Sequence, residues 1–383
     1  MELKKGYKQT EVGVIPKDWN IDSIKNLAIV KTGSKNTQDR IENGEYPFFV
    51  RSQTVERINS YSFDGEAVLT AGDGVGVGKV MHYIKGKFDC HQRVYRISGF
   101  ASNLNGYFFY LYFSNNFLNR IMQMTAKSSV DSIRMEMIAD MQVPVPPTKD
   151  EQTAIAIALS DTDALISSLQ KLIEKKRAIK QGAMQQLLKP KEGWVEKKLN
   201  AVGEIVTGST PPTGNKEYWD GAIPWITPTD INAEKDIYNS EREITTLGLQ
   251  VIRKLPPNTL LVTCIASIGK NAILRVSGAS NQQINAIIPY DEFDADFLYY
   301  LIGNNKKFLL RNAGITATLM ISKMDFAEIL FSIPKTKAEQ TSIAEILSDM
   351  DNEISALQVK LLKCQMLKQG MMQDLLTGKT RLI

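Results

Sequence analysis

Two stretches of the chain place apolar residues in alternating steps of four and three. A spacing of this kind, when sustained over several turns, predicts long amphipathic helices that pair along an apolar seam. The steps run through residues 148–190 and again through residues 336–378. We expect the seam to consist of Ile155, Leu159, Ile166, Leu169, Ile173 and Leu187 in the first stretch, and Ile343, Leu347, Met350, Ile354, Leu357, Leu361 and Leu375 in the second.

The two stretches are also copies of each other in sequence. EQTAIAIALSDTD begins at Glu151, and EQTSIAEILSDMD begins at Glu339, 188 residues later. Each copy opens with Thr-x-x-Glu, at Thr148 and Thr336, which predicts a capping box in which the glutamate reaches back to the cap. A helix of roughly 40 residues is about 60 Å long. One such helix could simply pack on its own domain, but two matching helices favour pairing with each other.

A β-rich unit precedes each helix. The units begin alike, with PKDWNIDSIKNLAIVKTGS at 16–34 and PKEGWVEKKLNAVGEIVTGS at 190–209, and then diverge. Short β-branched and aromatic runs separated by Gly, Pro and Asn predict strands, and each unit closes on a helical stretch. The predicted fold is therefore α+β: two similar β-rich domains, each followed by a long helix, with the helices forming an antiparallel coiled coil of pseudo-two-fold symmetry. The predicted boundaries are 1–147, 148–190, 191–335, 336–378, and a tail at 379–383.

Composition adds only broad limits. With 383 residues, 43% of them hydrophobic and 23% charged, the chain has material for two or three globular domains. No apolar run is long enough to span a bilayer, and no signal-peptide core follows the first residues. The net charge of +4 suits a nucleic-acid partner but is weak support for one. Three scattered cysteines predict neither a disulfide framework nor a metal site, so we expect a reducing cytoplasm.

The glycine-rich run GDGVGVGK at 72–79 does not fit a nucleotide site. A phosphate-binding P-loop needs a Gly five positions before Gly78 and a Ser or Thr after the lysine, where this chain has Asp73 and Val80. The run fits a structural turn or a hairpin tip against a DNA backbone. With two histidines, no carboxylate cluster and no Asn/Asp-Pro-Pro-Tyr/Phe motif, the sequence shows no catalytic constellation. We therefore expect a protein that is not itself an enzyme and binds no cofactor or metal.

Taken together, TEVGVIPKDW, GSTPPTGNKEYW, IPWITPTDI, the paired EQ-x-x-I helices and the ending LLTGKTRLI resemble the specificity subunit of bacterial type I restriction–modification systems. The resemblance implies two target recognition domains held by spacer helices on double-stranded DNA. It further implies docking to two methyltransferase subunits, which use S-adenosylmethionine, and to restriction subunits, which use ATP and Mg²⁺. The complex would methylate adenine in a bipartite asymmetric site or cleave DNA elsewhere. Apolar residues outside the seam, namely Leu165, Leu172, Ile179, Met366, Leu367 and Met372, would serve docking.

Polar loop residues of both units are the candidates for DNA contact. Arg and Lys suit guanine edges, Asn and Gln suit adenine, and hydroxyls suit phosphate. In the first unit we expect contacts from Ser34, Lys35, Asn36, Arg51, Gln53, Lys79, His91, Gln92 and Arg93. In the second unit we expect them from Ser209, Thr210, Lys216, Tyr218, Thr227, Thr229, Asp230, Lys270, Asn281, Gln282, Gln283, Thr316 and Thr318.

Two other classes of protein stay open at this point. A coiled-coil scaffold or regulatory protein that binds only other proteins would also fit the modest net charge. A fragment of a fused restriction–methylation enzyme is the second alternative. Binding to duplex DNA that weakens steeply with salt would separate DNA recognition from the scaffold, and an assay of the isolated chain for methyl transfer or cleavage would test for the enzyme.

Overall fold

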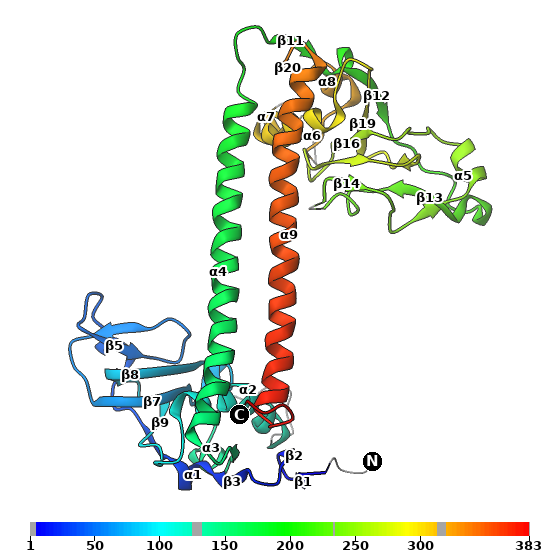
Figure 1. Ribbon diagram of the computed structural model, residues 1–383. Coiled ribbons are helices and arrows are strands. Elements are labelled where there is room, and N and C mark those ends of the chain that lie inside the picture. Colours follow the sequence, from blue (N-terminus) through cyan, green and yellow to red (C-terminus); the bar gives the residue numbers. More distant parts are fainter. Residues whose placement is uncertain (1–4, 125–131, 233, 312–318, 383) are drawn as a thin grey trace. The chain divides into compact units, whose positions relative to one another are not determined.

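The computed structural model describes residues 5–124, 132–232, 234–311 and 319–382. It divides into two units, one formed by Met1–Gln170 with Val359–Ile383 and the other by Lys171–Gln358. Each unit contains one β-rich domain together with one end of α4 (Lys149–Leu187) and one end of α9 (Lys337–Leu375) (Figure 1). The first unit holds the start of α4 and the end of α9, and the second holds the start of α9 and the end of α4.

Both long helices have 39 residues and begin in the same way. The hydroxyls of Thr148 and Thr336 accept hydrogen bonds from the backbone N–H groups of Glu151 and Glu339, at 3.2 and 3.3 Å. This half of the predicted capping box is present. Among the described residues, no helix combines the length and apolar character needed to cross a membrane.

The other half of the capping-box prediction is wrong. The carboxylate of Glu151 accepts hydrogen bonds from the Arg381 guanidinium rather than reaching back to its cap. The carboxylate of Glu339 accepts one from the indole N–H of Trp194, at 3.0 Å. At Glu151 the guanidinium outcompetes the local backbone amide, because a hydrogen bond between two ionised groups is stronger than one from a neutral N–H donor.

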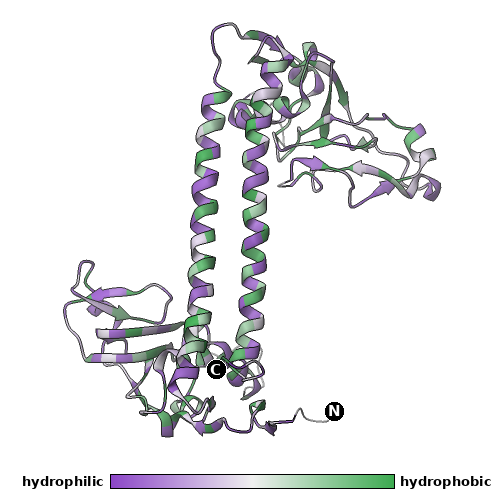
Figure 2. Cartoon of the chain, viewed as in Figure 1, coloured by the Kyte–Doolittle hydropathy of each residue, from purple (hydrophilic) through white to green (hydrophobic). Residues whose placement is uncertain are grey.

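The helices run antiparallel within each unit. In the first unit Lys368 lies 2.6 Å from Asp163, and in the second Lys180 pairs with Asp351. Because Lys368 is the copy of Lys180 and Asp351 is the copy of Asp163, one contact occurs twice with the roles of the helices exchanged. The predicted antiparallel pairing is therefore confirmed. All thirteen predicted seam residues are buried or half-buried, and Figure 2 shows hydrophobic and hydrophilic residues alternating along both helices.

The domain of the first unit is built on a six-stranded sheet. Its order is β4-β9-β7-β8-β5-β6, and every pair is antiparallel except β5 with β8. The strands are β4 (Ile29–Thr32), β5 (Tyr46–Phe49), β6 (Glu56–Ile58), β7 (Phe63–Ala71), β8 (Met81–Cys90) and β9 (Val94–Ser98). Two smaller pairs complete it: β1 (Tyr7–Thr10) with β2 (Gly13–Pro16), and β3 (Asn20–Ser23) with β10 (Gln142–Val145).

The core of this unit lies between the sheet and α2 (Gly106–Met124). Phe108, Phe109, Phe113 and Phe117 of α2 are fully buried there. The same cluster takes in the start of α4 and the end of α9 through residues such as Ile155 and Leu375. Short helices α1 (Ile24–Leu27) and α3 (Met135–Ala139) close its edge. The helix ends thus belong to the core of the domain rather than lying beside it.

The domain of the second unit contains a five-stranded sheet of order β12-β19-β16-β17-β14 and a three-stranded sheet of order β15-β13-β18. The strands are β12 (Gly203–Thr207), β13 (Trp219–Ile226), β14 (Asp236–Ile237), β15 (Glu243–Ile244), β16 (Thr259–Thr263), β17 (Asn271–Leu274), β18 (Ala279–Ser280) and β19 (Ile284–Pro289). A further pair joins β11 (Val195–Lys198) to β20 (Leu330–Ile333). The helices are α5 (Thr246–Gln250), α6 (Ala295–Asn304), α7 (Lys306–Arg311) and α8 (Lys323–Ala327).

The two domains follow one plan. In each, the first sheet strand pairs with a late strand, and that strand pairs with a hairpin, giving β4-β9-β7-β8 and β12-β19-β16-β17. A helix follows the late strand, α2 in one unit and α6 with α7 in the other. The fold predicted from the sequence, two similar β-rich domains each followed by a long helix, is confirmed. The separate three-stranded sheet of the second unit was not predicted.

A buried glutamine joins each domain to its long helix. Gln152 is 0% exposed; its Oε1 accepts from the N–H of Asn105, and its Nε2 donates to the carbonyls of Asn103 and Pro146, at 2.7 to 3.1 Å. Gln340, its copy, is 1% exposed, accepts from the N–H of Asp294 at 3.0 Å and donates to the carbonyl of Pro334 at 3.2 Å. These contacts explain why both helix starts carry the glutamine.

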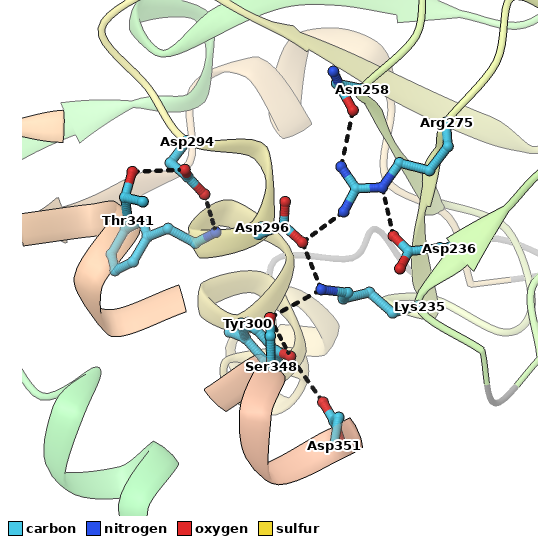
Figure 3. Close-up of polar contacts among 11 residues, drawn as sticks. Lys235, Asp236, Asn258, Arg275, Asp294, Asp296, Tyr300, Thr341, Ser348 and Asp351 are labelled. Carbon is cyan, nitrogen blue, oxygen red and sulfur yellow. Dashed lines mark hydrogen bonds and ion pairs between the residues drawn. The ribbon is translucent and has the colours of Figure 1, made fainter. Parts of the chain in front are cut away.

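Around this shared joint the two units differ. In the second unit Asp296 accepts from Lys235 and Arg275, both at 2.6 Å, and Lys235 also donates to Ser348 of α9 at 3.0 Å (Figure 3). Tyr300 of α6 donates to Asp351 of α9 at 2.8 Å. Asn105 corresponds to Asp294 in its contacts, so Tyr107 takes the place of Asp296 in the first unit.

The first unit has aromatic contacts where the second has charges. The Tyr107 ring lies 4.9 Å from that of Tyr83 and 5.6 Å from that of Tyr110. The Tyr83 hydroxyl donates to Glu66 at 2.5 Å. The joint is therefore aromatic in one unit and ionic in the other, although the glutamine is the same in both.

Replacing either buried glutamine should loosen its own unit. Gln152→Ala and Gln340→Ala leave buried backbone groups without partners, a loss of about 1–3 kcal/mol of unfolding free energy. Hydrogen exchange should speed up at the N–H of Asn105 in the first variant and of Asp294 in the second. The control variants Gln170→Ala and Gln358→Ala remove exposed glutamines of the same helices and should change neither amide. If the N–H groups of Asn105 and Asp294 exchanged equally slowly in all four variants, the proposed role of the buried glutamines would be wrong.

The ionic joint makes the second unit sensitive to pH. Although burial alone raises the pKa of Asp296, hydrogen bonds from Lys235 and Arg275 lower it overall. A lowered carboxyl pKa stabilises the folded state above the ordinary aspartate range and loses that effect as the pH falls through it. Asp296→Asn should therefore cost about 1.5–3 kcal/mol at pH 7 and progressively less in acid. Urea unfolding from pH 7 to pH 3 measures this, with the exposed Asp291→Asn as the control; a pH-independent cost would contradict it.

Candidate nucleic-acid interface

The repeated Thr-Gly-Ser marks a close backbone crossing at the end of the first sheet strand. A Cβ at Gly33 would lie 1.9 Å from the carbonyl oxygen of Cys90, and one at Gly208 would lie 2.0 Å from that of Asn281. No side chain fits at either position, so glycine is required for the first strand to pass over the turn that precedes β9 or β19. This crossing brings polar segments far apart in sequence onto one surface of each unit.

In the first unit the crossing places residues 34–36 against residues 91–93. The N–H of Gln92 donates to the carbonyl of Lys35 at 2.8 Å. The Gln92 side-chain amide donates to Asn36 Oδ1 at 2.6 Å. Gln92 is exposed and Asn36 half-buried, so this amide pair lies at the surface. Ser34 is exposed beside it.

Asp73 holds two arginines at the edge of the same surface. Its Oδ1 lies 2.8 Å from an Arg51 terminal nitrogen, and its Oδ2 lies 3.6 Å from Arg93 Nε. Both arginine side chains remain about half exposed, at 45% and 64%. The carboxylate thus orients two guanidinium groups whose remaining N–H donors are open to a ligand. Arginine forks of this kind suit guanine edges and phosphates.

His91 lies under this surface rather than on it. The residue is 5% exposed, and its Nδ1 accepts from the N–H of Arg93 at 2.9 Å. Burial, with the nearby Arg51 charge, lowers the pKa of His91, so the ring is neutral at pH 7. Its position counts against the predicted direct contact with DNA and favours a role in shaping the 91–93 turn.

The second unit repeats the arrangement with other side chains. The N–H of Ser209 donates to the carbonyl of Ser280 at 2.7 Å, and the Thr210 hydroxyl donates to Gln282 Oε1 at 2.6 Å. The Asn281 side-chain amide donates to Gln283 Oε1 at 3.1 Å. Gln282 occupies the position of Gln92, two residues before the strand residue that bonds the crossing glycine, but its partner is Thr210 and not an asparagine.

A hydroxyl cluster adjoins this site. The N–H of Asn281 donates to the carbonyl of Ile226, which brings the following residues close. The Thr227 hydroxyl donates to Asp230 at 2.7 Å and lies 2.7 Å from that of Thr229. A concavity of about 360 Å³ opens beside Thr229 and Asp230. This part of the surface offers hydroxyl donors and a carboxylate acceptor.

The other predicted residues are more scattered. Lys79 and Lys270 are exposed and end corresponding loops of the two units, and Gln53 is exposed in the loop after Arg51. Lys216 and Tyr218 lie in a short 3₁₀ turn next to the three-stranded sheet. Thr316 and Thr318 lie outside the described residues.

Three residues of this surface were missed by the sequence analysis. Asp73 is one; Arg253, which donates to the carbonyl of Thr207 at 2.7 Å, is another. The third is Arg242, whose guanidinium lies 4.0 Å from the ring centre of Trp219. Nothing local in the sequence marks them, because each acts on a residue at least 20 positions away. Within the described residues, no group of three His, Cys, Asp or Glu could hold a metal ion.

Comparison with known proteins identifies the family of this chain. The sequence profile of the type I restriction modification DNA specificity domain matches residues 16–178 and again residues 191–363. The chain belongs to this family. Each match spans one β-rich domain and most of the long helix that follows it.

Individual members of the specificity family agree. The chain is 37% identical to the type I restriction enzyme MjaIX specificity subunit of Methanocaldococcus jannaschii, over 43% of this chain and 39% of that one. It is 25% identical to the putative MjaX specificity subunit of the same organism, over 99% and 97%. The chain spans about half or less of the length of several curated relatives that it matches.

The fold is shared as well. The crystal structure of the type I restriction–modification S subunit from M. genitalium has a TM-score of 0.64 with this chain, covering 98% of both at 16% identity. At that identity the likeness concerns the fold alone.

Substituting the crossing glycine should disrupt the second site. Gly208→Ala would put a Cβ 2.0 Å from the Asn281 carbonyl, so the first strand and the turn must separate. Hydrogen exchange should accelerate at the N–H groups of Ser209 and Asn281, while the first unit is unaffected. Gly214→Ala, at an open position of the same unit, is the control. Unchanged exchange in Gly208→Ala would show that the crossing is not required.

Proposed function

We propose that this chain is the DNA-binding specificity subunit of a type I restriction–modification complex. Each unit recognises one half of a bipartite, asymmetric target in double-stranded DNA. The observation that carries the proposal is the glycine crossing, present in both units and surrounded in each by a different set of polar side chains. Membership of the specificity family supports it.

The different side chains predict different half-sites. The first unit offers Gln92, Asn36 and two oriented arginines, whereas the second offers amides and hydroxyls around Gln282 and Thr227. Amide side chains suit adenine and arginines suit guanine. Since the backbone plan is the same, the two units would approach DNA in the same way and still select unlike sequences. That the paired helices set the gap between the half-sites stays a prediction from the repeat.

Partner subunits would dock on the long helices. Leu165, Leu172 and Ile179 follow one another at steps of seven on α4 and are 38–47% exposed. Met366 and Leu367 of α9 are 65% and 60% exposed. These apolar positions support docking of methyltransferase and restriction subunits. Met372 was expected among them, but it packs against the core of the first unit instead.

The chemistry of the complex would lie in those partners. S-adenosylmethionine would be used by two methyltransferase subunits, and ATP with Mg²⁺ by restriction subunits, while this chain supplies only the choice of sequence. The assembly would act on DNA in the cytoplasm. A purified chain assayed alone should transfer no methyl group and cleave no DNA.

Methylome sequencing of a host that carries this chain with its methyltransferase subunit tests the proposal. Wild type should produce one split, asymmetric motif. Gln92→Ala should relax or change one half of that motif and Gln282→Ala the other, with about a 5- to 150-fold loss of discrimination at single positions, because a bidentate amide contact is worth about 1–3 kcal/mol.

Gln170→Ala, an exposed helix position, is the control and should leave both halves unchanged. A continuous palindrome would refute two-unit recognition. If the host showed no sequence-specific modification and the chain bound only protein partners, independently of salt, the result would favour the alternative of a coiled-coil scaffold protein.

A further inference from the structure

The glycine-rich loop of the first unit exposes a single valine. The loop joins β7 to β8 and carries Asp73 at its base and Val75 at its tip. Val75 is 97% exposed, the largest exposed fraction among the large apolar residues that the structure describes. The two neighbouring valines are buried, since Val77 is 4% and Val80 8% exposed. One apolar side chain is thus turned outward from a loop whose others are in the core.

The glycines fix this loop in place. Gly74 has φ +75°, which a side chain would oppose. A Cβ at Gly76 would lie 2.7 Å from the Arg51 carbonyl oxygen, and one at Gly78 would lie 2.7 Å from Ile121 Cδ1. The N–H of Val80 closes the loop on the carbonyl of Gly76 at 2.8 Å. The exposure of Val75 therefore follows from a packed loop, held on both sides, and not from a frayed end.

The neighbours of Val75 are those of the proposed DNA surface. Asp73, two residues before it, holds Arg51 and Arg93. A concavity of about 430 Å³ lies beside the loop tip and is lined by Val50, Arg51, Asp73 and Val75, among other residues. Its other aliphatic residue, Val50, is 7% exposed, so Val75 is the exposed aliphatic side chain of this concavity. A protein partner would ordinarily need a broader apolar patch.

An exposed valine beside the guanidinium groups of Arg51 and Arg93 is complementary to the major groove of DNA. There the C5 methyl group of thymine is the apolar feature of a base pair, and it is recognised by small apolar side chains, while arginine recognises the neighbouring guanine edge. We propose that Val75 is a specificity-determining residue of the first half-site and contacts the methyl group of one thymine. This inference rests on the proposed DNA-recognition function.

The second unit has no equivalent tip. Its loop, closed by the bond from the N–H of Thr263 to the carbonyl of Lys270, is two residues shorter than the loop closed by Ala71 and Val80. Ala266, at φ +59°, stands near the place of Gly74, and Ile268 is 1% exposed. The methyl contact is therefore confined to the first half-site.

Deoxyuridine tests the contact, because it lacks only the methyl group of thymidine. After methylome sequencing has given the wild-type motif, duplexes carrying deoxyuridine at each thymidine of both half-sites are bound to the full chain assembled with its methyltransferase subunits, at fixed salt. At one position of the first half-site, loss of the methyl should weaken wild-type binding about fourfold. Val75→Ala should bind the thymidine duplex about fourfold more weakly and should not distinguish the two duplexes.

Ile29→Ala is the matched control, since Ile29 is 55% exposed at the opposite end of β4 from Gly33. It should behave as wild type on every duplex. A split motif in which no thymidine position couples to Val75, or a first half-site without thymine, overturns the inference and leaves the proposed function intact. Absence of any split motif from the wild-type complex overturns the proposed function, and this inference with it.

Discussion

The structure depends on one buried contact that occurs twice: the glutamine at the start of each long helix, bonded to the backbone of its domain. Gln152 and Gln340 lie inside the protein, and each bonds backbone groups that are buried or partly buried. Because leaving such groups unpaired is costly, the domain and its helix cannot separate without loss of stability. The glutamine thus fixes the position of each long helix relative to the domain that precedes it.

Although the glutamine contact is the same in both units, the side chains around it differ. Near the start of α2 the first unit has Tyr107, and near the start of α6 the second unit has Asp296. Tyr107 packs against other aromatic rings, whereas Asp296 forms ion pairs. The glycine crossing behaves similarly, since Gly33 and Gly208 are kept while the side chains around them differ. What is retained in both copies is backbone geometry, and what varies is side-chain chemistry.

The same division explains what the sequence could predict. The long helices and their antiparallel pairing follow from periodic apolar positions and from duplication, both visible in the sequence. The role of Gln152 does not, because its partner Asn105 lies 47 residues earlier. The capping prediction failed at Glu151 for the same reason: Arg381, 230 residues away, is the stronger partner. Asp73 was passed over in a glycine-rich run, since its two arginines are brought to it only by the sheet.

The polar pairs at the two sites bear on how a proposed DNA target would be selected. Gln92 is hydrogen-bonded to Asn36, and Thr210 to Gln282. In the proposed complex a base edge would replace these bonds, and only a base that offers matching donors and acceptors would do so without loss. A mismatched base would leave these groups desolvated and unpaired, at about 1–3 kcal/mol each. Discrimination would then come chiefly from rejecting wrong sequences rather than from strong attraction to the right one.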